Sequence, residues 1–327
     1  MESSEIEGVV TTEVRETHRF DVAALERYMR EHVEGFRGPV IVRQFHGGQS
    51  CPTYYLESPG GKYVLRRKPP GKLLPSAHAV DREYRVITAL GRTDVPVPRT
   101  YALCEDPDVV GTAFYIMEYV HGRLMVEPDL PGVAPAERAA LFDAMNHVLA
   151  RLHTVDLGAV GLTDYGRPGN YFARQIHRWS QQYRASETEK IEAMEQLIEW
   201  LPAHVPADDQ TTIVHGDYRS GNMLMHPTEP RVVAVLDWEL STLGHPLADL
   251  AYHCMPYRLG PGHARRLRPR GPGRPRHPVG GGLPRDLLPP RGPHLDPRLG
   301  VLRRVLDVPP LRHRPGHHGP RHRRHRQ

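Results

Sequence analysis

The chain has 327 residues, more than one average domain, so it can form two lobes with a sizeable core. Its net charge of +5 combines two regions of opposite sign: residues 260–327 hold 17 Arg and 3 Asp without Lys or Glu, a charge of +14, so the first 259 residues carry −9. Three scattered cysteines exclude a disulfide framework and indicate a reducing cytoplasm, and the lack of a long apolar run excludes a membrane span.

The first predicted element is an amphipathic helix. In residues 21–33 (DVAALERYMREHV), apolar side chains recur at helical spacing behind Asp21, a residue type that favours the N-terminal cap of a helix. We assign residues 1–37 to this helix and a leader.

Residues 38–120 are predicted to form an antiparallel sheet with one helix. Apolar, β-branched runs separated by glycine-rich loops are typical of consecutive strands, and apolar residues at helical spacing predict a helix at 79–90. The five expected strands lie at 39–45, 52–58, 62–67, 100–106 and 112–120. A small α+β lobe is therefore expected.

The pattern becomes mainly helical in residues 121–259. A long helix is expected at 134–154, and further helical segments at 170–203. The runs IVHGD and VVAVLDW then predict two adjacent short strands, each ending at an aspartate, with a polar loop between them. Two carboxylates and one amide would thus converge on one point of a catalytic lobe.

Asp217, Asn222 and Asp237 are the candidate catalytic residues. Mg²⁺ prefers oxygen ligands, which the side chains of Asn222 and Asp237 would supply. Kinases use an Asp to orient the acceptor hydroxyl and accept its proton, and an Asn five residues later to bind metal, which is the spacing of Asp217 and Asn222. Each residue alone is also common in turns, but their joint spacing favours phosphoryl transfer.

The motifs HGDYRSGN and LDWE resemble the catalytic loop and metal-binding segment of the aminoglycoside phosphotransferase and choline kinase superfamily. The runs GGQSCPTYYL, YVLRRKPPGKLLPSAHAVDREYRVITAL and LDWELSTLGHPLADLAYHCMPYRL are similar to the kinase-like domain of acyl-CoA dehydrogenase family members ten and eleven. The resemblance covers about residues 15–259 and implies a bilobal, protein-kinase-like fold. It also implies a kinase that uses ATP and Mg²⁺ to phosphorylate a small-molecule alcohol.

Roles for individual residues follow from the resemblance. Asp217 would be the catalytic base, and Asn222 and Asp237 the magnesium ligands. Arg66 would be the phosphate-binding cation, where kinases usually carry Lys, and Glu83 would be its partner on a helix. The other nucleotide-binding positions would be the phosphate loop Gly47, Gly48, Gln49 and Ser50 and the adenine-binding hinge Met117, Glu118, Tyr119 and Val120.

Three further residues are expected to support the site. We expect His215 to pack and hydrogen-bond, because no second metal ligand lies at a suitable spacing. Asp249 is interpreted as a buried residue that braces the catalytic loop. Arg219 would contact substrate or phosphate, or form a structural ion pair. Gly47 and Gly48 on their own also fit an ordinary hairpin turn.

Residues 260–327 have an unusual composition. They contain only nine residue types, and each type can be encoded by a codon that begins with G or C. In a GC-rich gene it is normally the third codon position, not the first, that is restricted to G or C. We therefore interpret the segment as translated out of frame and disordered. Its charge also fits nucleic-acid binding, but it lacks aromatic residues for base stacking, and we expect no nucleic-acid partner.

The acceptor and two alternative functions stay open at this point. The resemblance favours a hydroxyacyl compound, such as a hydroxyacyl-CoA, over an aminoglycoside, whose pocket should be rich in carboxylates. One alternative is a nucleotide-binding pseudokinase or scaffold, because the helices that would complete the substrate lobe are missing. The other is RNA binding through the basic segment, with a salt-dependent affinity.

Overall fold

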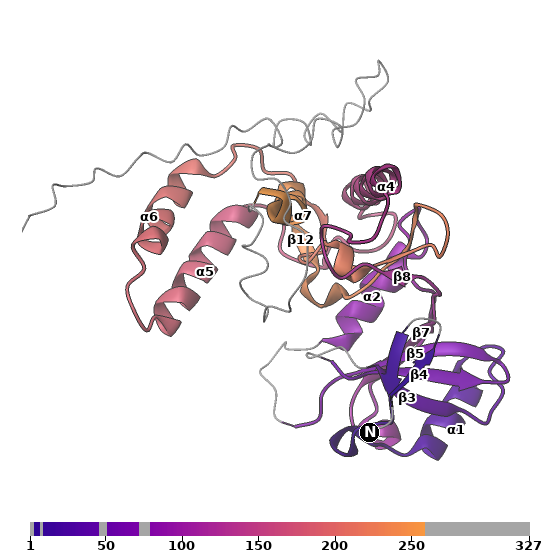
Figure 1. Ribbon diagram of the computed structural model, residues 1–327. Coiled ribbons are helices and arrows are strands. Elements are labelled where there is room, and N and C mark those ends of the chain that lie inside the picture. The colour runs from indigo at the N-terminus through magenta and orange to yellow at the C-terminus, as the bar shows by residue number, and fades with distance from the viewer. Residues whose placement is uncertain (1–2, 7–8, 46–50, 72–78, 259–327) are drawn as a thin grey trace, which may run out of the picture. The chain divides into compact units, whose positions relative to one another are not determined.

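The computed structural model describes residues 3–6, 9–45, 51–71 and 79–258 (Figure 1). Within these ranges the largest sheet has the strand order β1-β2-β3-β4-β5-β7-β6, and all neighbouring strands pair antiparallel. The strands are β1 (Ser3–Ile6), β2 (Val9–Thr12), β3 (Ile41–Phe45), β4 (Thr53–Ser58), β5 (Gly61–Arg67), β6 (Thr100–Cys104) and β7 (Phe114–Glu118). The five predicted strands are confirmed, and two short strands that were not predicted extend the sheet.

Two helices pack near the sheet and build the core of this lobe. Helix α1 (Val22–His32) begins after Asp21, whose side chain accepts two hydrogen bonds from backbone amides, as a capping residue does. Leu25 and Met29 of α1 are fully buried among apolar side chains of the sheet and of the short helix α3 (Pro107–Val110). Each such side chain contributes ~1.5–3 kcal/mol through burial.

Helix α2 (Val80–Leu90) lies between the sheet and the catalytic segments. It contacts β6 and β7 on one side and the 3₁₀ helix η4 (Trp238–Leu240) on the other. Glu83, which lies on α2, is therefore placed where the two lobes meet. The helix predicted at 79–90, which carries Glu83, is therefore confirmed.

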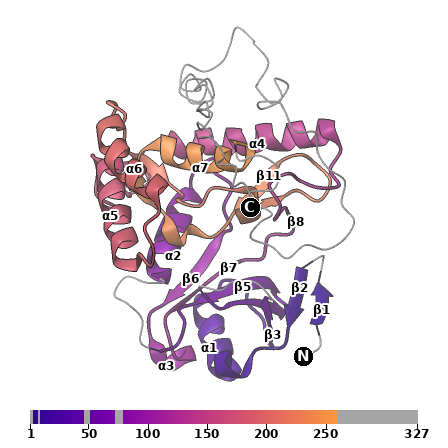
Figure 2. The same cartoon turned by 60° about the vertical axis from the view of Figure 1, so that its left-hand side comes forward.

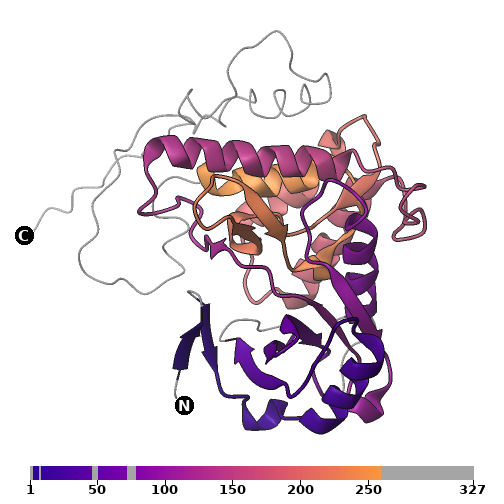
Figure 3. The ribbon, with the colours of Figure 1, turned by 90° about the vertical axis from the view of Figure 1, so that its right-hand side faces the viewer.

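The second lobe is mainly helical, as predicted. Its described helices are α4 (Pro135–His153), α5 (Tyr171–Ser186), α6 (Glu192–Trp200) and α7 (Pro246–Arg258). The other 3₁₀ helices in the described ranges are η1 (Glu16–His18), η2 (Leu201–His204) and η3 (Ser220–Asn222). Helix α4 lies alongside α7 (Figures 2 and 3), and His153 Nε2 is 3.3 Å from Asp249 Oδ2 of α7. No helix in the described ranges is both long and apolar enough to cross a bilayer.

The strands around the segments of the predicted catalytic residues belong to two separate small sheets, and Asp217, Asn222 and Asp237 themselves lie outside the strands. These strands are β8 (Arg123–Leu124), β9 (Thr212–Val214), β10 (Met223–Met225), β11 (Val232–Val235) and β12 (Thr242–Gly244). The prediction that the strands before Asp217 and Asp237 are adjacent is wrong, because β9 pairs with β12 whereas β11 pairs with β10. The two segments still meet, because the Leu236 amide donates a 2.8 Å hydrogen bond to the Asn222 carbonyl.

Candidate active site

Asp217 lies in a tight loop between β9 and η3. The preceding residue, Gly216, has a φ of +85°, and a Cβ at this position would lie 2.7 Å from the Leu240 carbonyl oxygen. Any other residue would therefore meet both backbone strain and a steric clash. Glycine lets the catalytic loop pass directly beside η4, which follows Asp237.

The Asp217 carboxylate is surrounded by hydrogen-bond donors and is 19% exposed. Arg219 Nε lies 3.1 Å from both of its oxygens, and Asn222 Nδ2 donates to Oδ2 at 2.7 Å. The Tyr252 hydroxyl also hydrogen-bonds to Asp217, and burial together with this bond raises the pKa of Tyr252. The sequence pointed to Arg219 and Asn222 but not to Tyr252, which lies on the unpredicted helix α7.

Asn222 and Asp237 form a donor set that fits Mg²⁺. The Asn222 side-chain nitrogen donates to Asp217, at 2.7 Å to Oδ2 and 3.0 Å to the backbone oxygen, so its amide oxygen is the atom left to bind a cation. Asp237 has a φ of +65°, unusual for a residue with a side chain, and its carboxylate is one-third exposed. One amide oxygen and one carboxylate are ligands that Mg²⁺ takes together with phosphate oxygens.

His215 connects the two functional segments. Its Nδ1 accepts a hydrogen bond from the Asp217 amide at 3.2 Å, so its Nε2 carries the proton and donates to the Leu236 carbonyl at 2.9 Å. The ring is fully buried and lies 4.7 Å from the Trp238 ring. His215 thus holds the residues next to Asp217 and Asp237 at a fixed separation.

Asp249 supports the same loop from α7. Its Oδ2 accepts from the His215 amide at 2.7 Å and its Oδ1 from the Gly216 amide at 2.8 Å, and the side chain is 1% exposed. Burial acts to raise the pKa of Asp249, but the hydrogen bond and charge of His153 and the interactions with His215 outweigh it and hold the pKa below its usual range. Asp249 is therefore an ionised, buried acceptor for the catalytic loop.

Arg66 brings the first lobe into contact with the second. Its side chain is 10% exposed, its Nε lies 2.9 Å from Glu83 Oε2, and its Nη2 lies 2.7 Å from Asp237 Oδ1. Burial raises the pKa of Glu83 to about 7 against the opposing charge of Arg66, and Tyr115 donates a hydrogen bond to the same carboxylate. Glu239, two residues beyond Asp237, lies 3.3 Å from Arg66 Nη2, a contact that the sequence did not indicate.

The predicted nucleotide-binding residues are only partly described. Gly47, Gly48, Gln49 and Ser50 lie outside the described residues. Met117 and Glu118 end β7, and Tyr119 and Val120 follow it. The amides of Glu118 and Tyr119 already donate to the backbone carbonyls of Arg99 and Lys62, at 2.8 and 3.4 Å. In this conformation those two amides are therefore not donors for an adenine ring.

Known proteins share sequence and fold with this chain. Residues 41–277 match the phosphotransferase enzyme family. The chain is 50% identical over 250 residues to acyl-CoA dehydrogenase family member 10 of Mus musculus, which covers 76% of this chain and 23% of the mouse protein. It spans 32% of acyl-CoA dehydrogenase family member 11 of Gallus gallus, at 51% identity. The chain thus corresponds to a third or less of these relatives.

Solved structures share the fold. A structure from Ralstonia eutropha JMP134, provisionally described as an aminoglycoside phosphotransferase, is 59% identical and superposes with a TM-score of 0.69 over 75% of this chain and 72% of that chain. A thermostable variant of the aminoglycoside phosphotransferase APH(4)-Ia, solved with ADP and hygromycin B, is 17% identical, with a TM-score of 0.52 over 72% of this chain and 77% of that chain. The expected kinase-like, bilobal α+β fold is therefore confirmed.

Proposed function

Because this chain belongs to the phosphotransferase enzyme family, we propose that it is a kinase that transfers the γ-phosphate of ATP to the hydroxyl of a small-molecule alcohol. The observation that carries this proposal is that the loop of Asp217 and Asn222 meets the segment of Asp237. The Asn222 side-chain nitrogen donates to the Asp217 carboxylate, and the Asn222 carbonyl accepts from the amide of Leu236, the residue before Asp237. This is the arrangement that phosphoryl transfer requires: one carboxylate for the acceptor, and oxygen ligands for a metal ion beside it.

Asp217 has the role of catalytic base in this proposal. One carboxylate oxygen orients the acceptor hydroxyl and takes its proton as the oxygen–phosphorus bond forms and the bond from the γ-phosphorus to ADP breaks, so that ADP leaves. Arg219 and Asn222 keep the carboxylate in place. Asn222 and Asp237 would hold Mg²⁺, which supplies charge neutralisation at the phosphates when bound. Arg66 would bind phosphate oxygens through its guanidinium, and catalysis comes mainly from positioning and electrostatic stabilisation.

ATP is the proposed phosphate donor. The support is the shared fold with APH(4)-Ia, whose structure holds ADP, and the hinge after β7. Since the Glu118 and Tyr119 amides are already hydrogen-bonded, we assign adenine recognition to the Val120 amide and to backbone carbonyls of the hinge. The phosphate loop Gly47, Gly48, Gln49 and Ser50 completes the proposed nucleotide site.

The proposed acceptor is a hydroxyacyl compound, such as a hydroxyacyl-CoA. The main support is the identity with acyl-CoA dehydrogenase family member 10. A pocket of about 60 Å³, room for only a small part of an acceptor, lies beside Arg219 and Tyr252, which both contact Asp217. Arg219, Tyr252 and mostly apolar residues line this pocket, and its described lining includes no carboxylate. A polycationic aminoglycoside would require carboxylates there, whereas a neutral or anionic alcohol would not.

We also infer that residues 260–327 are translated out of frame and that the working enzyme is cytoplasmic. The restricted set of nine residue types supports the first inference, and the small number of cysteines, three scattered along the sequence, supports the second. Exposed Trp179 and Trp200, on α5 and α6, are apolar surface that further helices would cover. Resequencing codons 255–275 would show a gained or lost base if the inference holds, and an unchanged reading frame would contradict it.

The variant D217N tests the proposed function. It keeps the size of the side chain but removes the proton acceptor, so we expect phosphate transfer to fall by at least about 10³-fold while ATP affinity changes less than about twofold. Transfer would be measured with radiolabelled ATP and a panel of hydroxyacyl-CoA compounds, with D143N on the exposed face of α4 as the control. Retained transfer would exclude Asp217 as the base, and nucleotide binding without transfer by the wild-type chain would favour the scaffold.

A further inference from the structure

The Arg66 guanidinium lies among three carboxylates that come from two segments, helix α2 and the segment around η4. Its Nε lies 2.9 Å from Glu83 Oε2 of α2, an ion-pair contact without hydrogen-bond geometry. Its Nη2 lies 2.7 Å from Asp237, at the end of the β11 segment, and 3.3 Å from Glu239 of η4. One cation thus holds together an N-lobe helix and two residues of the metal-binding segment, and Asp237 and Glu239 share the same nitrogen.

Arginine suits this arrangement because its planar guanidinium carries donors on three nitrogens. Nε can stay beside Glu83 while Nη2, which has two N–H groups, donates to either of two carboxylates. A lysine ammonium is a point charge and cannot span these positions in the same way.

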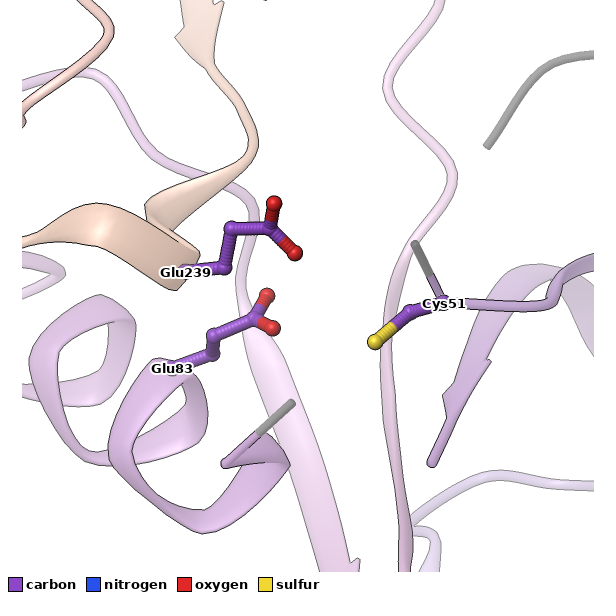
Figure 4. A group of neighbouring side chains, drawn as sticks. All are labelled: Cys51, Glu83 and Glu239. Carbon is purple, nitrogen blue, oxygen red and sulfur yellow. The ribbon is translucent and has the colours of Figure 1, made fainter. Parts of the chain in front are cut away.

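The cluster itself is not a second metal site. Cys51, Glu83 and Glu239 place one ligand atom each within 4.8 Å of one another (Figure 4). However, the positive charge between the two glutamates is already supplied by Arg66. Burial raises the pKa of the Cys51 thiol to about 12, so the sulfur is protonated and a poor ligand at neutral pH. One oxygen of Glu83 and one oxygen of Glu239 already lie within ion-pair distance of the guanidinium.

We propose that Glu239 is a positioning residue that holds the Arg66 guanidinium when Asp237 binds a divalent cation. This inference rests on the proposed function, in which Asp237 is a metal ligand. Asp237 Oδ1 lies at hydrogen-bond distance from Nη2, so a cation at Asp237 competes with Arg66 for the same carboxylate and repels it. Glu239 offers Nη2 a second anion, so Arg66 keeps its place beside Glu83 and the phosphate site.

The variant E239Q removes the negative charge with little change in shape. Arg66 Nη2 then keeps Asp237 as its carboxylate partner but loses the negative charge of Glu239. A divalent cation that binds Asp237 must displace Arg66 from that carboxylate, and no second anion compensates for the lost contact. We expect the affinity for Mn²⁺, measured by electron paramagnetic resonance with the full chain in the presence of ADP, to fall about tenfold. The affinity for ADP without metal and the melting temperature should stay within about twofold and about 2 °C of the wild type.

A matched control is E137Q, which removes one carboxylate from a different ion pair. Glu137 Oε1 lies 2.9 Å from Arg123 Nη2, with both side chains about one-third exposed. The same loss of charge far from Asp237 should leave Mn²⁺ affinity unchanged. E239D, which keeps the charge on a shorter side chain, should recover part of the affinity.

A double-mutant cycle with R66K separates positioning from direct metal binding. If Glu239 acts through the fork of Arg66, E239Q should weaken Mn²⁺ binding less than about twofold when position 66 is Lys. A tenfold loss that persists in the R66K background would instead make Glu239 a metal ligand and overturn the inference. An unchanged Mn²⁺ affinity in E239Q alone would also overturn it, whereas wild-type protein that binds no Mn²⁺ would refute the proposed metal site itself.

Discussion

At the scale of single residues, we expect the stability of the loop that carries Asp217 to depend on Asp249. Its two oxygens accept the amides of His215 and Gly216 in a fully buried position. In D249N the side chain keeps one accepting oxygen, and its other oxygen is replaced by an NH₂ group. That NH₂ donor would then face a backbone N–H donor in a buried position, with no acceptor between them. We expect a loss of about 2–4 kcal/mol in the free energy of unfolding, measured by urea denaturation.

The control for Asp249 is an aspartate on the same type of element with an exposed side chain. Asp143 of α4 is 59% exposed, and D143N should change the free energy of unfolding by less than about 0.5 kcal/mol. Equal stability of D249N and D143N would show that the loop does not depend on the Asp249 carboxylate.

The sequence predicted the candidate residues unevenly, for a physical reason. Asp217 and Asn222 are five positions apart in one loop, so their chemistry is visible in a contiguous motif. The contact of Tyr252 with Asp217 and that of Glu239 with Arg66 depend on how distant segments pack. Glu239 was within the quoted LDWE motif, so its identity was available but its partner was not.

At the scale of elements, helices α5 and α6 expose an apolar surface within the described part of the chain. The two helices have no buried residue, and the large apolar side chains exposed on or beside them are Trp179, Ile191, Leu197 and Trp200. Arg184 of α5 forms an ion pair with Glu195 of α6, so the two helices contact each other through charge. A solvent-exposed apolar surface of this kind is typical of a region that packs against another segment.

This surface predicts a difference between the present chain and a chain with a corrected reading frame. We expect the present chain to bind the dye anilinonaphthalene sulfonate, and the double variant W179S/W200S to bind several-fold less, with little loss of stability because both side chains are about half exposed. Fluorescence titration measures the effect. The corrected chain should bind as little dye as the double variant; strong binding by the corrected chain would mean that the added helices cover another surface.

The elements that were not predicted from the sequence have weak hydrophobic patterns. Strands β1 and β2 have four residues each, too few for an alternating pattern to be distinguished from a loop. Helix α7 contains Pro256, a residue that normally ends a helix, so its pattern is interrupted. The long helix α4 and the glycine-bounded strands β4 and β5 have clear periodicity and were predicted to within a few residues.

At the scale of the whole molecule, pH should change stability through His253 on α7. Its side chain is buried near the Tyr218 ring, and burial lowers the pKa of His253 to about 4 although Asp249 acts in the opposite direction. The unfolded chain takes up a proton near pH 6.5 and the folded chain only near pH 4. Stability is therefore full above pH 6.5 and falls between pH 6.5 and 4, by about 3 kcal/mol from this group.

The comparison that isolates this effect is the slope of unfolding free energy against pH in H253Q. Other groups also titrate below pH 5, but they are common to both proteins, so the difference between the two slopes belongs to His253. We expect the H253Q curve to be flatter between pH 6.5 and 4.5, whatever its absolute stability. H147Q, at a histidine of α4 that is 59% exposed, should keep the wild-type slope. Parallel curves for wild type and H253Q would mean that His253 is protonated equally in the folded and unfolded chains. Acid sensitivity would then have to come from carboxylates such as Asp249, whose pKa is held low in the folded chain. The stability that Asp249 contributes is lost only as the pH falls below the usual pKa of an aspartate.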